Sequence, residues 1–536
     1  MYTPKRARLM FPSPIRLLTK RMLQKRYNSC QVPALLTNCS LQASRQVTIE
    51  NLSDEVLLNI FRYYLDASPR FWLWLVHICR KWRRIVFASK RALRLRLLCT
   101  HGTPILSLKA LDCWPTLPIV VHHGGSLALN PPAPEDEDNI MAALNQSDRV
   151  SSISLTVTSS LLEKLSAIEK PFSQLEDLVL LSRDSIRQTL PSAFRWGTRL
   201  RCLHLTRVAF PALLHLLYAS TNLVDLQLHE VINPWHFSPE ALTDALSGTP
   251  RLRSLSLHLL TTANYIALDL PLPPPPEKRI ALPVLTRLSF RGIAEYLEGL
   301  VAGIDAPRLG DIEVTLFNEF IFDPSVLSAF IDRTEMQRSQ LRAEILSSER
   351  AISISITQPE ASTRLELQVS CEPLARQFSC LAEICDGLSA FLLGVEHLHI
   401  GATQPPRGQD DSDDEEWAKL IYPFRGAKSV HVAGDHSTNI VCALRSPHRL
   451  QPALHRLYIA QPGPRHAPLR EAVVSFMTSC RLSGHPIEVE YEQLCHISGL
   501  RGTGPFSQPA PNEILSDDIL LNIFQHYLDA SPRCWP

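Results

Sequence analysis

The chain has 536 residues, of which 45% are hydrophobic and 20% are charged, and this composition excludes both a largely disordered chain and a single small domain. Lys and Arg total 54 against 53 for Asp and Glu, so the formal charge of +1 provides no global field for nucleic acid or an anionic membrane. Uninterrupted runs of about 18 apolar residues, which a membrane-spanning helix needs, do not occur, and we expect no membrane contact.

The first 48 residues form a basic segment, because no acidic residue precedes Glu50. We predict a disordered, solvated arm over 1–48. A nuclear-import signal around Lys5–Arg8 and a transit peptide are the alternatives for such a segment. The expected compartment is therefore the cytoplasm or the nucleus, with mitochondrial targeting as the lesser alternative.

Apolar residues begin to recur at helical spacing after Leu52. Ser53 is suited to cap a helix, and acidic residues follow it in the first turn, where they favour the positive end of the helix dipole. Apolar residues then recur three and four positions apart, first before Pro69 and again after it. We predict two short amphipathic helices within 49–98, with these apolar residues: Leu57, Ile60, Phe61 and Leu65 in the first; Leu75, Ile78, Cys79, Trp82, Ile85 and Val86 in the second.

A connecting segment with a first strand is expected over 99–149, and a repeat follows over 150–490. Blocks with apolar residues at positions one, four and six recur at steps of 25, 25, 23, 29, 33 and 24 residues, a spacing typical of leucine-rich repeats. Alternating residues predict a strand in each block and the segments between predict helices. The blocks start at Val150, Leu175, Leu200, Leu223, Leu252, Leu285 and Leu309.

The repeat blurs beyond Leu309 and returns as alternating segments at 351–356, 365–369, 395–400, 429–432 and 454–459. We expect these strands to continue one sheet almost to a helix around 469–480. A proline loop at 271–276 and an acidic loop at 405–416 are predicted as solvated insertions.

The two ends of the chain share one sequence. Residues 52–72 match residues 515–535 at 16 of 21 positions. Between the repeat and this second copy lies a predicted linker, 491–511. The copy, within 512–536, contains only the first helix of the pair, so we expect a duplication junction or an incomplete end. A decoy helix that competes for the same partner is the alternative.

No pattern in the sequence predicts catalysis. Residues 122–126, His-His-Gly-Gly-Ser, are similar to the oxyanion loop of esterases, but G-x-S-x-G, G-x-x-x-x-G-K-[S/T] and H-E-x-x-H are all absent. The 13 cysteines include no C-x-x-C pair, which favours a reducing compartment and predicts no zinc site. We therefore predict no catalytic residue, no metal and no cofactor.

The segment from Leu52 to about Leu98 resembles an F-box, through the leucine-rich first helix and the L-V-x-x-C-x-x-W arrangement that ends at Trp82; Ser53 stands where the family usually has proline. The rest of the chain is similar to large F-box proteins of fungal type with an irregular leucine-rich region. The resemblance implies an α/β fold in which a short helical F-box precedes an irregular leucine-rich-repeat-like solenoid. It also implies adaptor-binding residues Leu52, Ser53, Val56, Leu57, Ile60, Phe61, Leu65, Leu75, Val76, Cys79 and Trp82.

The function implied by this resemblance is that of a non-catalytic substrate receptor. The F-box would dock a Skp-type adaptor and thereby a cullin scaffold, while the repeat region would bind a protein substrate for ubiquitin-dependent proteolysis. The alternative is a leucine-rich-repeat scaffold outside any ligase, associated with nucleic acid through the basic arm. We do not expect nucleic acid on the helices, because the chain has no basic net charge and the basic residues at 80–96 match a solvated helix face.

Overall fold

The computed structural model describes residues 52–492, apart from gaps at 68–71, 101–110, 112–113, 124–133, 169, 183–187, 191–194, 231–237, 260–278, 318–323, 349–350, 360–362, 371–373, 403–413, 435–436, 446–452 and 461–466. The basic arm, the proline loop, most of the acidic loop and the second copy of residues 52–72, within 512–536, lie outside the described residues. The chain divides into two compact units, 1–61 with 509–536, and 62–508.

Among the described residues of the range 49–98 there are three helices, where two were predicted: α2 (Asp54–Ala67), α3 (Trp72–Ile78) and α4 (Arg80–Ala88). The predicted cap is confirmed, because the Val56 amide donates to Ser53 Oγ over 3.3 Å. The predicted second helix is interrupted at Cys79, whose backbone is extended (φ −154°, ψ 170°) and whose Sγ accepts a bond from the Trp82 amide. The apolar spacing continues across this break, so the sequence pattern did not reveal it.

The helical part is also shorter than predicted. It ends at Ala88, and a strand begins at Leu97, inside the range 49–98 that was expected to be helical. The indole of Trp72 donates from Nε1 to the carbonyl of Arg96 over 2.8 Å, just before that strand, and its ring meets the ring of Trp114 edge-on. These contacts attach α3 to the start of the sheet.

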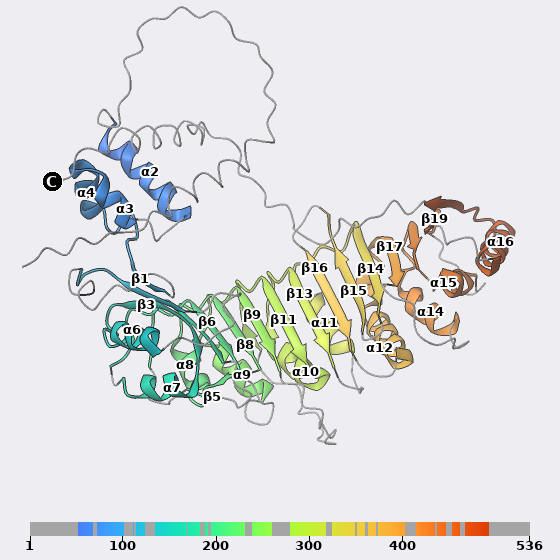
Figure 1. Cartoon of the computed structure of the whole chain (residues 1–536). Coiled ribbons are helices and arrows are strands. Elements are labelled where there is room, and N and C mark those ends of the chain that lie inside the picture. The colour runs from blue at the N-terminus through green and yellow to red at the C-terminus, as the bar shows by residue number, and fades with distance from the viewer. Residues whose placement is uncertain are drawn as a thin grey trace, which may run out of the picture. The chain divides into compact units, whose positions relative to one another are not determined.

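Sixteen strands form one mixed, mostly parallel sheet (Figure 1). Their spatial order follows the chain except for one reversal: β1-β2-β3-β4-β6-β8-β9-β11-β13-β16-β15-β14-β17-β18-β19-β20. Their bounds are β1 (Leu97–Thr100), β2 (Ile119–His123), β3 (Val150–Val157), β4 (Asp177–Ser182), β6 (Cys202–Thr206), β8 (Asp225–His229), β9 (Ser254–His258), β11 (Arg287–Gly292), β13 (Asp311–Leu316), β14 (Leu341–Ser347), β15 (Ile352–Thr357), β16 (Arg364–Val369), β17 (Val395–Ala402), β18 (Ser429–Val432), β19 (Arg456–Ala460) and β20 (Glu488–Glu492).

The register of the parallel strands has the periodicity that the sequence predicted. Seven residues are paired side by side from β3 to β13, at positions 152, 177, 202, 225, 254, 287 and 311. The differences between these positions are 25, 25, 23, 29, 33 and 24, which are the steps between the sequence blocks. Each block therefore places its strand beside the preceding one without a slip in register.

The reversal lies where the sequence repeat blurs. Strand β15 is antiparallel to both β14 and β16. The first strand of this three-stranded meander, β14, lies farthest from β13, and the last, β16, lies next to it. Consequently β16 pairs with β13, and β14 pairs with β17, both in parallel. Strands β15 and β16 were predicted, whereas β14 was not.

One face of the sheet is covered by helices (Figure 1). Residues alternate in burial along the strands, and the buried apolar residues lie on the covered face. Leu178, Leu203 and Leu226, for example, are paired across three neighbouring strands, and each has no exposed surface. Consecutive helices from α8 to α12 contact one another. The remaining helices are α6 (Pro134–Leu144), α7 (Ser159–Ser166), α8 (Leu213–Ala219), α9 (Pro239–Leu246), α10 (Ala294–Gly303), α11 (Pro324–Asp332), α12 (Leu374–Gly387), α13 (Ser389–Leu392), α14 (Asp414–Ile421), α15 (Ser437–Leu444) and α16 (Ala467–Leu482), with a 3₁₀ turn at Tyr422–Phe424.

Two details differ from the predicted insertions and ends. The last residues of the acidic run begin helix α14 at Asp414, so this part of the expected loop is helical. The sheet also extends past α16 to β20. Two small parallel pairs lie outside the main sheet, β5 (Gln188–Thr189) with β7 (Val208–Ala209), and β10 (Ile280–Ala281) with β12 (Ile304–Asp305). Among the described residues, none of the helices is long and apolar enough to cross a membrane.

Candidate functional site

The second face of the large sheet is polar. We call it the open face, and it consists of the alternate strand residues that are not among the buried apolar set. From β6 to β16 its members are mostly charged residues, histidines and small hydroxyl residues. They are Cys202, His204, Thr206, Asp225, Gln227, His229, Ser254, Ser256, His258, Arg287, Ser289, Arg291, Asp311, Glu313, Thr315, Arg364, Glu366 and Gln368.

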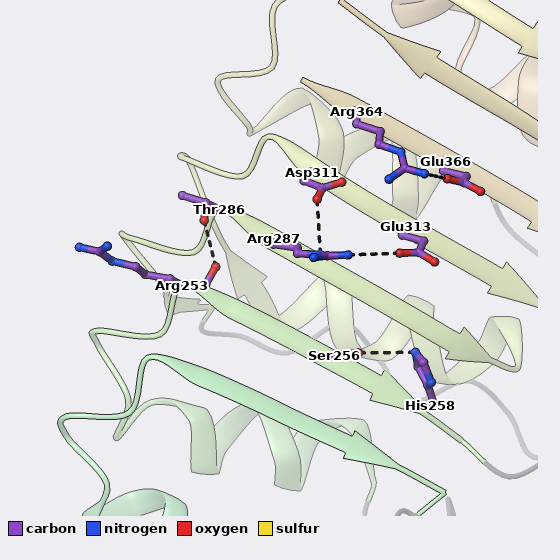
Figure 2. Close-up of polar contacts among 9 residues, drawn as sticks. All are labelled: Arg253, Ser256, His258, Thr286, Arg287, Asp311, Glu313, Arg364 and Glu366. Atoms are coloured by element: carbon purple, nitrogen blue, oxygen red, sulfur yellow. Dashed lines mark hydrogen bonds and ion pairs between the residues drawn. The ribbon is translucent and has the colours of Figure 1, made fainter. Parts of the chain in front are cut away.

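Charges of opposite sign alternate on the open face from β11 to β16 (Figure 2). Arg287 lies 3.4 Å from a carboxylate oxygen of Asp311 and 3.7 Å from one of Glu313. Arg364 pairs with Glu366 on its own strand. Exposed ion pairs contribute about 1 kcal/mol or less to stability. Their main consequence is a patterned surface that discriminates between charged partners.

Two histidines form a flat stack on β8 and β9. The rings of His229 and His258 are 3.8 Å apart at an angle of 4°, and His229 Nε2 lies 3.0 Å from Ser256 Oγ. Burial and then the charge of His204 lower the pKa of His229, while burial, His229 and Arg291 lower the pKa of His258 to about 4. Both rings are therefore neutral at pH 7.

Beside this stack, Cys202, His204 and Asp225 converge. His204 Nε2 lies 3.1 Å from Cys202 Sγ and 2.8 Å from Asp225 Oδ2. Burial, together with the charges of Asp225 and Asp177, raises the pKa of the Cys202 thiol to about 12. Burial opposes ionisation of Asp225, yet its bond with His204 holds the pKa of that carboxyl below its ordinary value. The cluster at neutral pH is thus a thiol beside a carboxylate.

This cluster does not have the arrangement of a catalytic triad. In such a triad the nucleophile and the carboxylate contact opposite nitrogens of the histidine. Here the thiol and the carboxylate both lie at Nε2 of His204. A thiol whose pKa is raised is also a poor nucleophile at neutral pH, since the thiolate is the reactive form.

An arginine-lined pocket lies at the edge where β4, β6, β8 and β9 begin. Its volume is about 630 Å³, and its lining residues are Glu176, Arg199, Arg201, Asn222, Val224, Arg251, Arg253 and Val284. The four arginines are exposed and outnumber the single glutamate. Arg251 Nη1 donates to Asn222 Oδ1 over 2.8 Å. Guanidinium groups bind carboxylate and phosphate groups through paired hydrogen bonds, so this pocket suits an anionic group.

The predicted adaptor-binding residues fall into three classes of burial. Six of them are buried within the chain itself: Leu57, Phe61, Leu65, Leu75, Val76 and Trp82. Leu52, Ile60 and Cys79 are half-buried, and Ser53 and Val56 are exposed. The apolar residues of α2 form two stripes. Leu57, Phe61 and Leu65 recur every four residues and are buried. Val56, Ile60 and Tyr63 recur at spacings of four and three, and they keep part of their surface exposed. Val56 is 39% exposed and Tyr63 is 59% exposed.

The polar cluster and the arginine pocket were not predicted from the sequence. A signal for the first was present: Cys-x-His within a strand places both side chains on one face, and the next repeat step of 23 residues places Asp225 beside Cys202. A similar signal existed for the pocket, since Arg201 and Arg253 each precede the first residue of a strand in the repeat.

Comparison with known proteins adds little to this geometry. No model of a known protein family matches the sequence. No curated protein matches it either. Among solved structures, the chain is similar to a protein from Bacteroides fragilis at 12% sequence identity and a TM-score of 0.22, over 68% of this chain and 74% of that one.

Proposed function

We propose that this protein is the substrate-recognition subunit of a Skp-cullin-F-box ubiquitin ligase. In this proposal α2, α3 and α4 form the F-box, and the strands and helices from β3 onward form an irregular leucine-rich solenoid that receives a protein substrate. The chain itself supplies no catalytic group and no cofactor. The compartment we propose is the cytoplasm or the nucleus.

The observation that carries the proposal is the second apolar stripe of α2. Val56, Ile60 and Tyr63 keep apolar surface exposed on a helix that already buries Leu57 and Phe61. An apolar stripe left on the surface of a short helix favours a protein partner. Because this segment resembles an F-box, we propose a Skp-type adaptor as that partner.

Substrate binding is assigned to the open face. A broad sheet face without a covering helix layer presents many side chains in fixed register, which suits recognition of an extended protein surface. The arginine-lined pocket at the edge of this face supports an acidic or phosphorylated segment as part of the substrate.

Adaptor binding is tested by co-purifying the full chain with the Skp-type adaptor. Val56→Asp and Ile60→Asp each place a charge in the docking stripe, and we expect binding to weaken by about tenfold or more, equivalent to about 1.4 kcal/mol. Arg62→Asp is the control, because it places the same carboxylate at an exposed position of α2 that is not three or four residues from any member of the stripe. Phe61→Asp is unsuitable, since Phe61 has no exposed surface and the substitution would disturb the fold.

The proposal fails if the wild-type chain does not bind the adaptor. It fails equally if both stripe variants bind as well as wild type while circular dichroism shows them folded. A leucine-rich scaffold outside any ligase is then the remaining interpretation, and salt-dependent binding of the full chain to DNA or RNA would identify its nucleic-acid-associated form.

The acidic-substrate part of the proposal has a separate test. Peptides selected on the wild-type chain from a mixed library should be enriched in acidic or phosphorylated sequences. The double variant Arg201→Glu and Arg253→Glu should lose that enrichment, whereas Arg470→Glu, at an exposed arginine of helix α16 outside both the pocket and the open face, should keep it. Equal enrichment in all three proteins would remove the pocket from the substrate site without affecting the adaptor result.

A further inference from the structure

The strongest site outside the proposed receptor function is the cluster of Cys202, His204 and Asp225. Alternate positions on β6 bring Cys202 and His204 to the same side of the sheet, and the register of β8 pairs Asp225 with Cys202. One potential ligand atom from each residue lies within 4.8 Å of the other two. Among the residues that the structure describes, no other group of three His, Cys, Asp or Glu residues converges in this way.

Both close contacts within the cluster involve Nε2 of His204. Cys202 Sγ is 3.1 Å and Asp225 Oδ2 is 2.8 Å from the same ring nitrogen of His204. The other carboxylate oxygen, Asp225 Oδ1, is buried, and no donor among the described residues meets hydrogen-bond geometry with it, although the Ser254 hydroxyl is close enough to help lower the pKa of this carboxyl. Three potential ligand atoms of different chemical types within 4.8 Å of one another, with a buried carboxylate oxygen beside them, are the arrangement from which a cation site can form.

We propose that Cys202, His204 and Asp225 bind a zinc ion on the open face of the sheet. Sulfur, imidazole nitrogen and carboxylate oxygen are the three ligand types that zinc accepts. The Cys202 thiol gives up its proton to solvent when it ligates the ion. A thiolate and a carboxylate together then balance the two positive charges of zinc, which limits the cost of holding the ion on a half-buried surface.

The geometry requires only a small adjustment. Bonds of about 2.0 to 2.3 Å in a tetrahedral site separate the ligand atoms by about 3.3 to 3.7 Å. The observed separations of 3.1 and 2.8 Å at His204 would therefore widen by a few tenths of an ångström to about half an ångström. Gln227, whose Nε2 donates to Asp225 Oδ2 over 3.3 Å, orients the carboxylate from outside the ligand set.

Three protein ligands leave one position of the tetrahedron open. Because the three residues stand on the open face, that position is directed away from the helix-covered side and is accessible to water or to a side chain of a bound protein. The ion would also join β6 to β8 through their side chains. This inference does not rest on the proposed ligase function, since it needs neither the adaptor nor a substrate.

Cobalt(II) is the probe that tests the site, because it replaces zinc in tetrahedral sites and reports a bound thiolate through a charge-transfer band in the near ultraviolet. The full chain is purified under reducing conditions, freed of metal and titrated first with Co²⁺ and then with Zn²⁺. We expect one ion per chain, a charge-transfer band at saturation and loss of that band when zinc displaces cobalt.

Three variants and one control assign the ligands. Cys202→Ser should abolish the charge-transfer band, and His204→Gln and Asp225→Asn should each weaken zinc binding by roughly tenfold or more. The control Cys442→Ser removes another half-buried thiol, outside the cluster, and should leave the band and the affinity unchanged.

The proposal is overturned if the wild-type chain shows no saturable one-to-one binding, or if the band persists in Cys202→Ser, whatever the result for Cys442→Ser. Thermal unfolding of each metal-free variant establishes that it is folded. Zinc should also raise the unfolding temperature of the wild type but not that of Cys202→Ser, because only a ligand that binds the folded state stabilises it.

Discussion

Two consecutive leucines on β4 test the two-faced sheet directly. Leu180 faces the helices and is 1% exposed, between buried Leu155 of β3 and buried Leu205 of β6. Leu181 follows it on the open face and is half-buried. Replacing either by alanine changes strand propensity by the same amount, so the difference between the two variants measures the difference between the faces.

The expected magnitude follows from burial. Leu180→Ala removes three buried carbons, worth about 2.4 kcal/mol at about 0.8 kcal/mol each, and leaves a cavity that raises the loss to about 3–4 kcal/mol. Leu181→Ala removes carbons that water already reaches in part, and we expect a loss of about 1 kcal/mol.

Hydrogen exchange of the β3, β4 and β6 amides is the suitable assay, because a 16-stranded sheet can open in parts and exchange reports the local free energy of opening. Urea unfolding monitored by circular dichroism provides the global value. Equal losses for the two variants, or a larger loss for Leu181→Ala, would refute the assignment of the covered and open faces.

Three other expectations concern the fold. Gly394→Ala should destabilise the chain by about 3 kcal/mol in urea unfolding, because the added methyl group would overlap the carbonyl oxygen of Arg338 at the start of β17; unchanged stability would contradict this packing. The free energy of unfolding should fall by about 1 kcal/mol between pH 6.5 and 4, because the pKa of His258 is about 4 in the folded chain, whereas the unfolded chain takes up this proton below pH 6.5. The loss is smaller than the full pKa difference implies, since His258 is half-exposed and solvent screens its charge. His258→Gln should flatten this pH dependence. Ser53→Ala should cost about 1 kcal/mol of helix stability, seen as reduced ellipticity on heating, since it removes the acceptor for the Val56 amide; a cost below about 0.3 kcal/mol would show that this cap contributes little.

The parallel part of the fold was predictable because it is local. Each block from Val150 to Leu309 contains its own strand signal, and the distance between blocks determines the register once successive strands pair. The helix cap at Ser53 was predictable for the same reason, because the acceptor and the donor are three residues apart.

Features that depend on distant pairing were not predictable in this way. The alternation in β15 and β16 predicts strands, but a period of two is the same for parallel and antiparallel neighbours, so it cannot reveal the meander or its reversed order. Likewise, the helical spacing continues through Cys79, while the backbone there turns out of the helix. The arginine pocket needs Arg201 and Arg253 at equivalent positions before β6 and β9, with β8 between them, and this placement depends on the pairing of three strands.

The near-zero net charge of the chain conceals a separation of charge along the sheet. Four arginines line the pocket at the start of β4 to β9, whereas the last strand, β20, carries exposed Glu488 and Glu490 on alternate positions. Charges on an edge strand discourage pairing with another sheet, so the glutamates have a protective role of their own. On the proposed receptor they would also orient the substrate, with its acidic segment toward the pocket and its basic segment toward β20. Because exposed charges act chiefly on the association rate, raising the salt concentration should slow substrate association far more than it accelerates dissociation.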